Sequence, residues 1–174
     1  MSSDWEVRAI FHFTVNASDF ERSLAFYQLL GFKLLRDNRD VVWPPFVAAN
    51  FGMKRAQGRG ALLAIGPEEH HTRLDLIEWL EPKLVDPQAH VPQDERVPRI
   101  IALRTRNVRA AYLDLRAKGV VFHGAPNPPD PRSGIEAVVC CRDPDGNIVE
   151  LIEYMEGLLG SRIDHLERRK DESE

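Results

Sequence analysis

The chain contains few cysteines, and their positions argue against a disulfide or a thiolate metal site. Its 174 residues include only two, Cys140 and Cys141, which are adjacent. Neighbouring residues of a strand point to opposite faces, so these two thiols are poorly placed to bond each other or to share a zinc ion. A disulfide scaffold is therefore not expected, and the cytoplasm is the default expectation for this protein.

Long apolar runs and basic stretches are also missing. No apolar run approaches the roughly 18 residues that span a bilayer, and the N-terminus MSSDWEVRAIF lacks the basic and then apolar order of a signal peptide. The net charge is −4, and no run of lysine and arginine offers a stripe for phosphate contacts. Neither nucleic acid nor a membrane is expected as a partner. One compact domain, or two half-domains with a common core, fits the length.

Hydrophobic periodicity predicts the same order of elements twice. In the first half a strand over 8–16 precedes a helix that Ser18 caps and Gly31 ends. Two or three further strands are expected, over 32–38, over 60–66 and, as the third, over 41–50, before the last strand of this half over 72–80. After a proline-broken linker over 81–98, the second half predicts a strand over 99–107, a helix over 108–119, and strands over 120–126, 134–143 and 147–155.

The two halves align with each other by hand. Gly31 aligns with Gly119, and the stretch RLDLIEW (73–79) lies over IVELIEY (148–154). The fold class predicted is α+β, with one β-α-β-β-β module over 8–80 and a second over 99–155. A curled half-sheet cannot cover its own concave face, so the modules are expected to pair into a curled sheet or open barrel. The charged tail over 156–174 receives no function.

The stretch RDPDGNIVELIE carries two acids, Glu150 and Glu153, on one expected strand. Positions three apart in a strand face opposite ways, so one acid points inward and the other into water. The alternation alone leaves open which of the two points inward. A buried carboxylate needs a cation or hydrogen-bond donors to compensate it.

Two stretches, HFTVNASDFERSLAFYQLLGF and RDPDGNIVELIE, resemble the vicinal oxygen chelate superfamily. This group contains glyoxalases, extradiol dioxygenases, methylmalonyl-CoA epimerases and bleomycin- or fosfomycin-resistance proteins. The resemblance implies metal ligands on the first and last strand of each half, which here are His12, Asp75 and Glu150. It therefore also implies that Glu150 is the inward acid, compensated by the metal, and that Glu153 sits outside in water. The fourth such position is Ile100, where metal-using members typically have a second histidine.

An imidazole and two carboxylates, completed by waters, would suit a divalent metal such as Mg²⁺, Mn²⁺ or Fe²⁺. The two-histidine, one-carboxylate triad of oxygen-activating iron cannot be assembled from these positions, which disfavours a dioxygenase. A zinc or nickel site of the glyoxalase kind is disfavoured less. Each residue also has a structural alternative: backbone amides or an arginine at Glu150, an arginine at Asp75, and a hydrogen-bonded core role for His12.

Other side chains could contact a small-molecule substrate. Arg104 shares a strand face with Ile100, so both are candidates for substrate contact; the arginine could clamp a carboxylate or phosphate, or form a salt bridge instead. The segment 40–60 carries large apolar groups that predict a lid, a pocket wall or a dimer contact: Trp43, Phe46, Phe51 and Met53. A flat aromatic or polyketide-like molecule, or an acyl chain, would suit such a pocket, with an acidic or carbonyl head at His12.

Three functions follow, in decreasing order of preference. The first is a glyoxalase-like lyase or isomerase acting beside a carbonyl, with Glu150 as ligand or general base and His12 as ligand or acid/base. The second is a non-catalytic, antibiotic-like binding protein, which the isoleucine at 100 favours. The third is a ring-cleaving dioxygenase. A homodimer is expected in each case.

Overall fold

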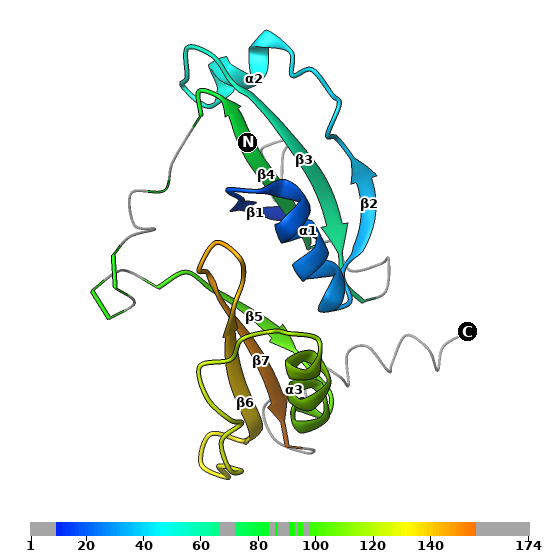
Figure 1. Cartoon of the computed structure of the whole chain (residues 1–174), viewed down its shortest axis with the longest axis vertical. Helices are drawn as coiled ribbons and strands as arrows, with labels where there is room; N and C mark the ends of the chain where they lie inside the picture. Colours follow the sequence, from blue (N-terminus) through cyan, green and yellow to red (C-terminus); the bar gives the residue numbers. More distant parts are fainter. Residues whose placement is uncertain are drawn as a thin grey trace, which may run out of the picture. The chain divides into compact units, whose positions relative to one another are not determined.

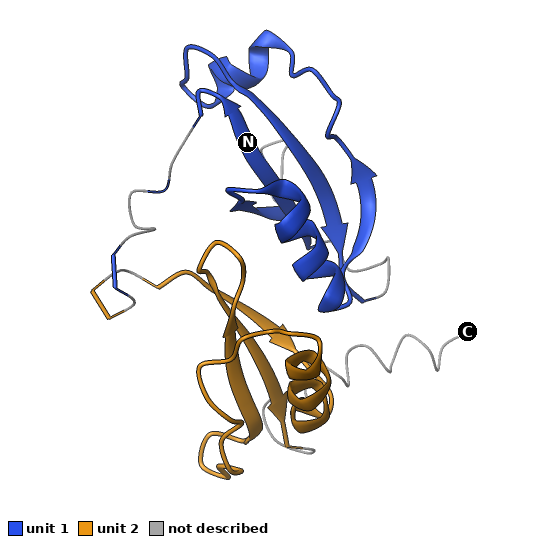
Figure 2. Cartoon of the chain, viewed as in Figure 1, with its two compact units in different colours: residues 1–92 blue, residues 93–174 orange. Residues whose placement is uncertain are grey.

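The computed structural model describes residues 10–66, 72–83, 86, 91–92, 94–95 and 98–155. The chain forms two compact units, residues 1–92 (unit 1) and 93–174 (unit 2), coloured separately in Figure 2. Their boundary falls within the linker expected over 81–98. Each unit has an open sheet with a helix beside it, which confirms the α+β class (Figure 1). Residues 8 and 9 of the first expected strand and the tail over 156–174 lie outside the described residues.

Unit 1 is a four-stranded sheet with one long and one short helix. Along the chain the elements are β1 (His12–Asn16), α1 (Phe20–Leu29), β2 (Lys33–Asp37), α2 (Pro45–Asn50), β3 (Gln57–Ala64) and β4 (Arg73–Glu81). The strand order is β1-β4-β3-β2, with β1 parallel to β4 and the other pairs antiparallel. The core lies between α1 and the sheet, where five of the largest side chains are fully buried: Phe20, Tyr27, Leu63, Leu74 and Leu76.

Unit 2 is a three-stranded sheet with one helix. Its elements are β5 (Ile100–Arg104), α3 (Val108–Ala117), β6 (Ile135–Arg142) and β7 (Ile148–Tyr154). The strand order is β5-β7-β6, with β5 parallel to β7. In both units the final strand therefore lies between its neighbours, and its alternate residues face the helix or the opposite side of the sheet. None of the described helices in either unit is long and apolar enough to cross a membrane.

The predictions of a strand over 41–50 and of a strand over 120–126 are wrong. Residues 41–50 contain helix α2 instead of a strand, and Pro45 begins it, because the fixed φ of proline suits the first helical turn. Residues 120–126 form one isolated bridge, Phe122 to Cys141, so the second module lacks one of its predicted strands. The proline-rich chain that follows cannot continue a ladder, because proline has no backbone N–H.

The predicted C-terminal ends of helices α1 and α3 are confirmed, whereas the predicted N-cap of α1 is not. Gly31 and Gly119 follow α1 and α3 with φ of 94° and 91°, in the left-handed region that glycine tolerates. At the start of α1 the cap is Asp19, whose Oδ1 accepts the Arg22 N–H at 3.0 Å. The cap predicted at Ser18 is wrong; that hydroxyl accepts a bond from the Arg22 guanidinium at 2.9 Å.

Candidate functional site on the helix-free sheet faces

The two acids of the last strand have different surroundings, and Glu153 is not a solvated residue. Its carboxylate accepts the backbone N–H groups of Asn107 and Val108, each at 2.9 Å, at the start of α3. Since unpaired N–H groups and a partial positive charge gather at a helix N-terminus, an acid is stabilised there. The expectation that Glu153 sits in water is therefore wrong: it faces the helix and satisfies its first turn.

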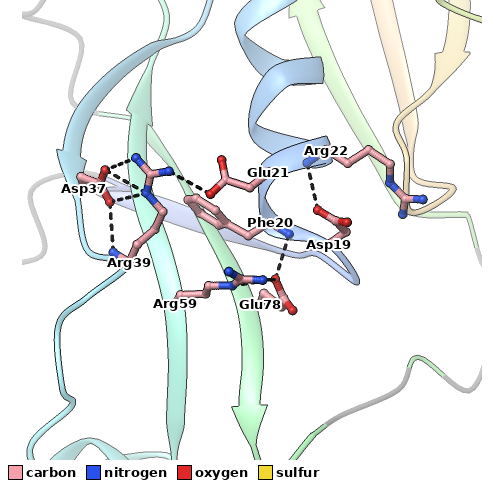
Figure 3. A network of polar contacts seen from close by, with 8 residues as sticks. All are labelled: Asp19, Phe20, Glu21, Arg22, Asp37, Arg39, Arg59 and Glu78. Atoms are coloured by element: carbon pink, nitrogen blue, oxygen red, sulfur yellow. Dashed lines mark hydrogen bonds and ion pairs between the residues drawn. The ribbon is translucent and has the colours of Figure 1, made fainter.

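Unit 1 repeats this arrangement at the equivalent position. Glu78 of β4 accepts the Phe20 N–H at 2.9 Å at the start of α1 and pairs with Arg59 at 2.9 Å, as Figure 3 shows. Next to it, Arg39 joins Asp37 of β2 to Glu21 of α1. These contacts lie on the helix-covered side of the sheet. They are structural, and they leave the opposite side for Asp75.

Glu150 lies on the side of the unit 2 sheet that faces away from α3. This side, and the side of the unit 1 sheet that faces away from α1, are called the helix-free faces, with reference to these two described helices. Its register partners are Ala102 on β5 and Cys140 on β6, and its side chain is half-buried. Burial first, and the charge of Glu150 second, raise the pKa of the Cys140 thiol. No hydrogen bond or ion pair joins the Glu150 carboxylate to another described residue. Neither the backbone amides nor the arginine considered for it are found there.

Asp75 occupies the equivalent place in unit 1, with His12 close to it. Asp75 lies between Thr14 of β1 and Leu62 of β3 in the register. Burial raises its pKa, and the nearby His12 charge opposes that shift. His12 is exposed on the edge strand β1, with its ring edge-to-face with Phe11 at 5.3 Å. The buried, hydrogen-bonded role considered for His12 is not what the structure has.

An aromatic cluster extends the same face of unit 1. The Trp43 and Trp79 rings are 5.5 Å apart at 82°, and Phe51 is 6.1 Å from Trp79 at 67°. The Trp79 Nε1–H donates to Asn16 Oδ1 at 2.9 Å, which orients the indole on the sheet. Trp43, Phe51 and Trp79 are called the aromatic cluster below.

The absence of a side chain at Gly58 leaves room for the Trp43 ring on this face. A Cβ at Gly58 would lie 2.8 Å from the Glu78 carbonyl oxygen and 2.9 Å from Cη2 of Trp43. Trp79 and Gly58 were missed from the sequence, although alternation along β4 from Asp75 puts Trp79 on the same face. No local signal marks the contact between Trp43 and Gly58, because a long connection separates them.

The remaining candidates are dispersed. Phe46 is 63% exposed on α2, and the Met53 N–H closes that helix on the Ala48 carbonyl. Ile100 and Arg104 belong to unit 2, on edge strand β5, where Ile100 is 57% exposed. The Arg104 guanidinium lies 5.8 Å from the Tyr154 ring centroid, a cation–π contact that the sequence did not indicate.

The metal ligands expected from the resemblance do not meet within one unit. Unit 1 supplies an imidazole and a carboxylate, His12 and Asp75, while Glu150 belongs to unit 2. Among the described residues no three histidine, cysteine, aspartate or glutamate side chains gather in a metal-binding group. Zinc sites usually employ three or more side-chain ligands, a number that the described residues of one unit do not bring together. The set His12, Asp75 and Glu150 stays a prediction.

Comparison with known proteins agrees with the fold. A family profile described as the Glyoxalase/Bleomycin resistance protein/Dioxygenase superfamily matches residues 9–151. The chain belongs to this superfamily. A comparison with curated proteins finds no significant match.

Solved structures of the superfamily resemble the chain over most of its length. A glyoxalase family protein from Bacillus cereus has a TM-score of 0.72 at 12% identity, covering 89% of this chain and 99% of its own. TnmS3, an antibiotic-binding protein from Streptomyces sp. CB03234, has a TM-score of 0.56 at 26% identity, with 86% and 98% covered. The trypanothione-dependent glyoxalase I of Leishmania major has 0.56 at 22%, with 96% and 98% covered. Enzymes and binding proteins both occur in this superfamily, so its fold leaves the activity open.

Proposed function

We propose that this superfamily member binds a flat aromatic small molecule and sequesters it without catalysis. The observation that carries the proposal is the aromatic cluster on the helix-free face of unit 1. Edge-to-face indoles, together with the phenyl ring of Phe51, offer stacking surfaces, and each aromatic pair stabilises by about 0.5–1.5 kcal/mol beyond its buried area. Apolar walls with a few polar groups are typical of small-molecule sites.

Polar groups on the same face suit a ligand with an acidic or carbonyl head. His12 lies on β1 and Asp75 on β4, and Trp79 follows Asp75 four positions later on the same strand. Four residues of a strand span about 13 Å, the length of a three-ring polycycle. The polycycle would lie over Ile77 and Gly60, with its rings at the aromatic cluster and its head near the His12 imidazole.

Two further observations support binding over turnover. Ile100 stands where metal-using members of the superfamily typically have a histidine, and a sequestering protein needs no complete ligand set. TnmS3, which is 26% identical, is an antibiotic-binding protein.

Tryptophan fluorescence tests the proposal. Anthraquinone-2-carboxylate is a flat probe with an acidic head, and decanoate carries the same head on an acyl chain. We expect the anthraquinone to quench emission saturably and decanoate to bind at least about tenfold more weakly. Trp79→Leu should abolish the saturable phase, whereas Val42→Ala, a change beside Trp43 at a side chain 82% exposed, should leave it intact. Equal quenching by a wild-type chain and the Trp79→Leu variant would contradict the proposal.

A metal-assisted lyase or isomerase is the second candidate, and the closeness of His12 to Asp75 favours it. An imidazole beside a carboxylate is the start of a donor set for a divalent ion, and the resemblance to the superfamily adds Glu150 to that set. Such an ion would supply polarisation of a substrate carbonyl, and Glu150 would serve either as its ligand or as the general base for the proton beside that carbonyl. Calorimetric titration with Mn²⁺, Ni²⁺ and Zn²⁺ tests this: binding lost in His12→Ala and strengthened in Ile100→His supports the site. Absence of binding in both the wild-type chain and Ile100→His removes the site.

A homodimer is proposed on the edge strands. The strand β1 and the residues before it expose Ile10, Phe11 and Phe13, and β5 exposes Ile100. Unpaired edges with apolar side chains favour pairing with another strand. Light scattering after size exclusion should give twice the mass of the 174-residue chain; the mass of one chain would refute the dimer. A cytoplasmic location stays a prediction.

A further inference from the structure

The chain around Trp43 is attached to the sheet by a side chain instead of by a strand. Residues 41–44 belong to no helix or strand. Gln57, the first residue of β3, accepts the Trp43 backbone N–H on its Oε1 at 2.9 Å, and its Nε2–H donates to the Val41 carbonyl at 3.1 Å. A carboxamide has one acceptor and one donor group, as a peptide unit does, so Gln57 replaces the pairing that a neighbouring strand would provide.

The same short stretch of β3 contacts both the backbone and the ring of Trp43. Gln57 binds the backbone N–H, and the next residue, Gly58, lies under the indole. The Gln57 Nε2 also donates to the Gly58 carbonyl at 3.2 Å, which keeps the carboxamide in one orientation. The edge-to-face geometry of Trp43 with Trp79 therefore depends on where Gln57 holds the backbone.

An ion pair near the end of the segment 41–56 contributes less to holding this segment on the sheet. Arg55 forms an ion pair with Glu81, and the two side chains are 73% and 51% exposed. Exposed ion pairs stabilise by at most about 1 kcal/mol. The Trp43 N–H is part-buried, so losing its acceptor leaves a donor poorly solvated, which is the more costly change.

We infer that Gln57 is a positioning residue of the ligand site: its carboxamide holds Trp43 against Gly58 and Trp79 and so shapes the aromatic cluster for a planar ligand. The role of Gln57 in ligand affinity rests on the proposed binding function. Gln57 itself needs no contact with the ligand. Two substitutions separate its groups: Gln57→Glu keeps an acceptor for Trp43 but cannot donate to Val41, and Gln57→Leu keeps the size and removes both.

The test combines ligand titration with ¹⁹F NMR on protein labelled with 5-fluorotryptophan. The chain has three tryptophans, so three resonances are expected, assigned with Trp→Phe variants. Anthraquinone-2-carboxylate is the probe. In Gln57→Leu the Trp43 resonance should move to the position of a solvated indole, the Trp79 resonance should shift, and Kd should rise about tenfold or more. Gln57→Glu should give an intermediate effect, and Arg55→Ala, in the same segment, should match wild type in both readouts.

The outcomes distinguish this role from the binding function itself. Unchanged resonances and Kd in Gln57→Leu overturn it, and so does a weakened Kd with unmoved resonances, because Gln57 would then contact the ligand directly. If wild type binds no probe yet Trp43 still moves in Gln57→Leu, the binding proposal fails while the positioning of Trp43 stands. If Gln57→Leu does not fold, Gln57→Glu alone decides by the same two readouts.

Discussion

The contact of Glu153 with the start of α3 leads to a quantitative prediction. Its carboxylate accepts two backbone N–H groups, those of Asn107 and Val108, and Val108 is fully buried. In Glu153→Gln one N–H keeps an acceptor, while the other faces an amide N–H group. Hydrogen bonds to charged groups stabilise by about 1.5–3 kcal/mol, and loss of a helix cap costs about 0.5–2 kcal/mol. Since Asn107 is exposed, the lower part of these ranges applies, about 1–2 kcal/mol.

Thermal unfolding followed by circular dichroism measures this cost. For a unit of this size about 1–2 kcal/mol lowers Tm by roughly 5–10 °C. The matched control is Glu136→Gln on β6, where no hydrogen bond to a described residue is lost, and it should unfold with wild type. Hydrogen exchange at the first turn of α3 should accelerate in Glu153→Gln only. A Glu153→Gln protein that unfolds at the wild-type temperature, with unchanged exchange, would refute the reasoning.

Four further predictions concern three positions on the helix-free faces and Cys141, the register partner of the buried Val149. Burial raises the pKa of Asp75 in the folded chain, so the ionised form costs stability above that pKa and nothing below the ordinary aspartate value. Asp75→Asn should therefore raise Tm at neutral pH and match the wild-type Tm in acid. Equal Tm values for the two proteins at both pH values would contradict this. Burial raises the pKa of Cys141 to about 11, so a disulfide reagent at mildly alkaline pH should modify it only after unfolding. Besides burial, the Glu150 charge contributes to raising the pKa of Cys140, so Cys140 should react slowly in the native protein and faster in Glu150→Gln. An equal rate in the two proteins would show that the Glu150 charge does not act on the Cys140 thiol. Gly58→Ala should red-shift the tryptophan emission and lower Tm, whereas Gly124→Ala, with no atom within 4 Å of its Cβ, should do neither.

Period-two alternation correctly predicted that Glu150 and Glu153 lie on opposite faces of their sheet. Asp75 and Glu150 lie on the helix-free faces, as alternation from their buried neighbours predicts, because the side-chain period of a strand is local geometry. The repeat, the superfamily and the glycines that end α1 and α3 were likewise readable, since each is recognised from the pattern within short stretches of sequence.

Only the tertiary structure decided what those acids and the large aromatics contact. Glu153 faces a helix N-terminus more than 40 residues away in sequence, and the same is true of Glu78 and α1. Helix α2 replaced an expected strand because proline at its first turn outweighed the β-branched residues before it. Trp43 contacts Trp79 because Gln57 of β3 binds its backbone N–H and Gly58 leaves room for its ring. Each of these depends on non-local packing, for which a single sequence carries no periodic signal.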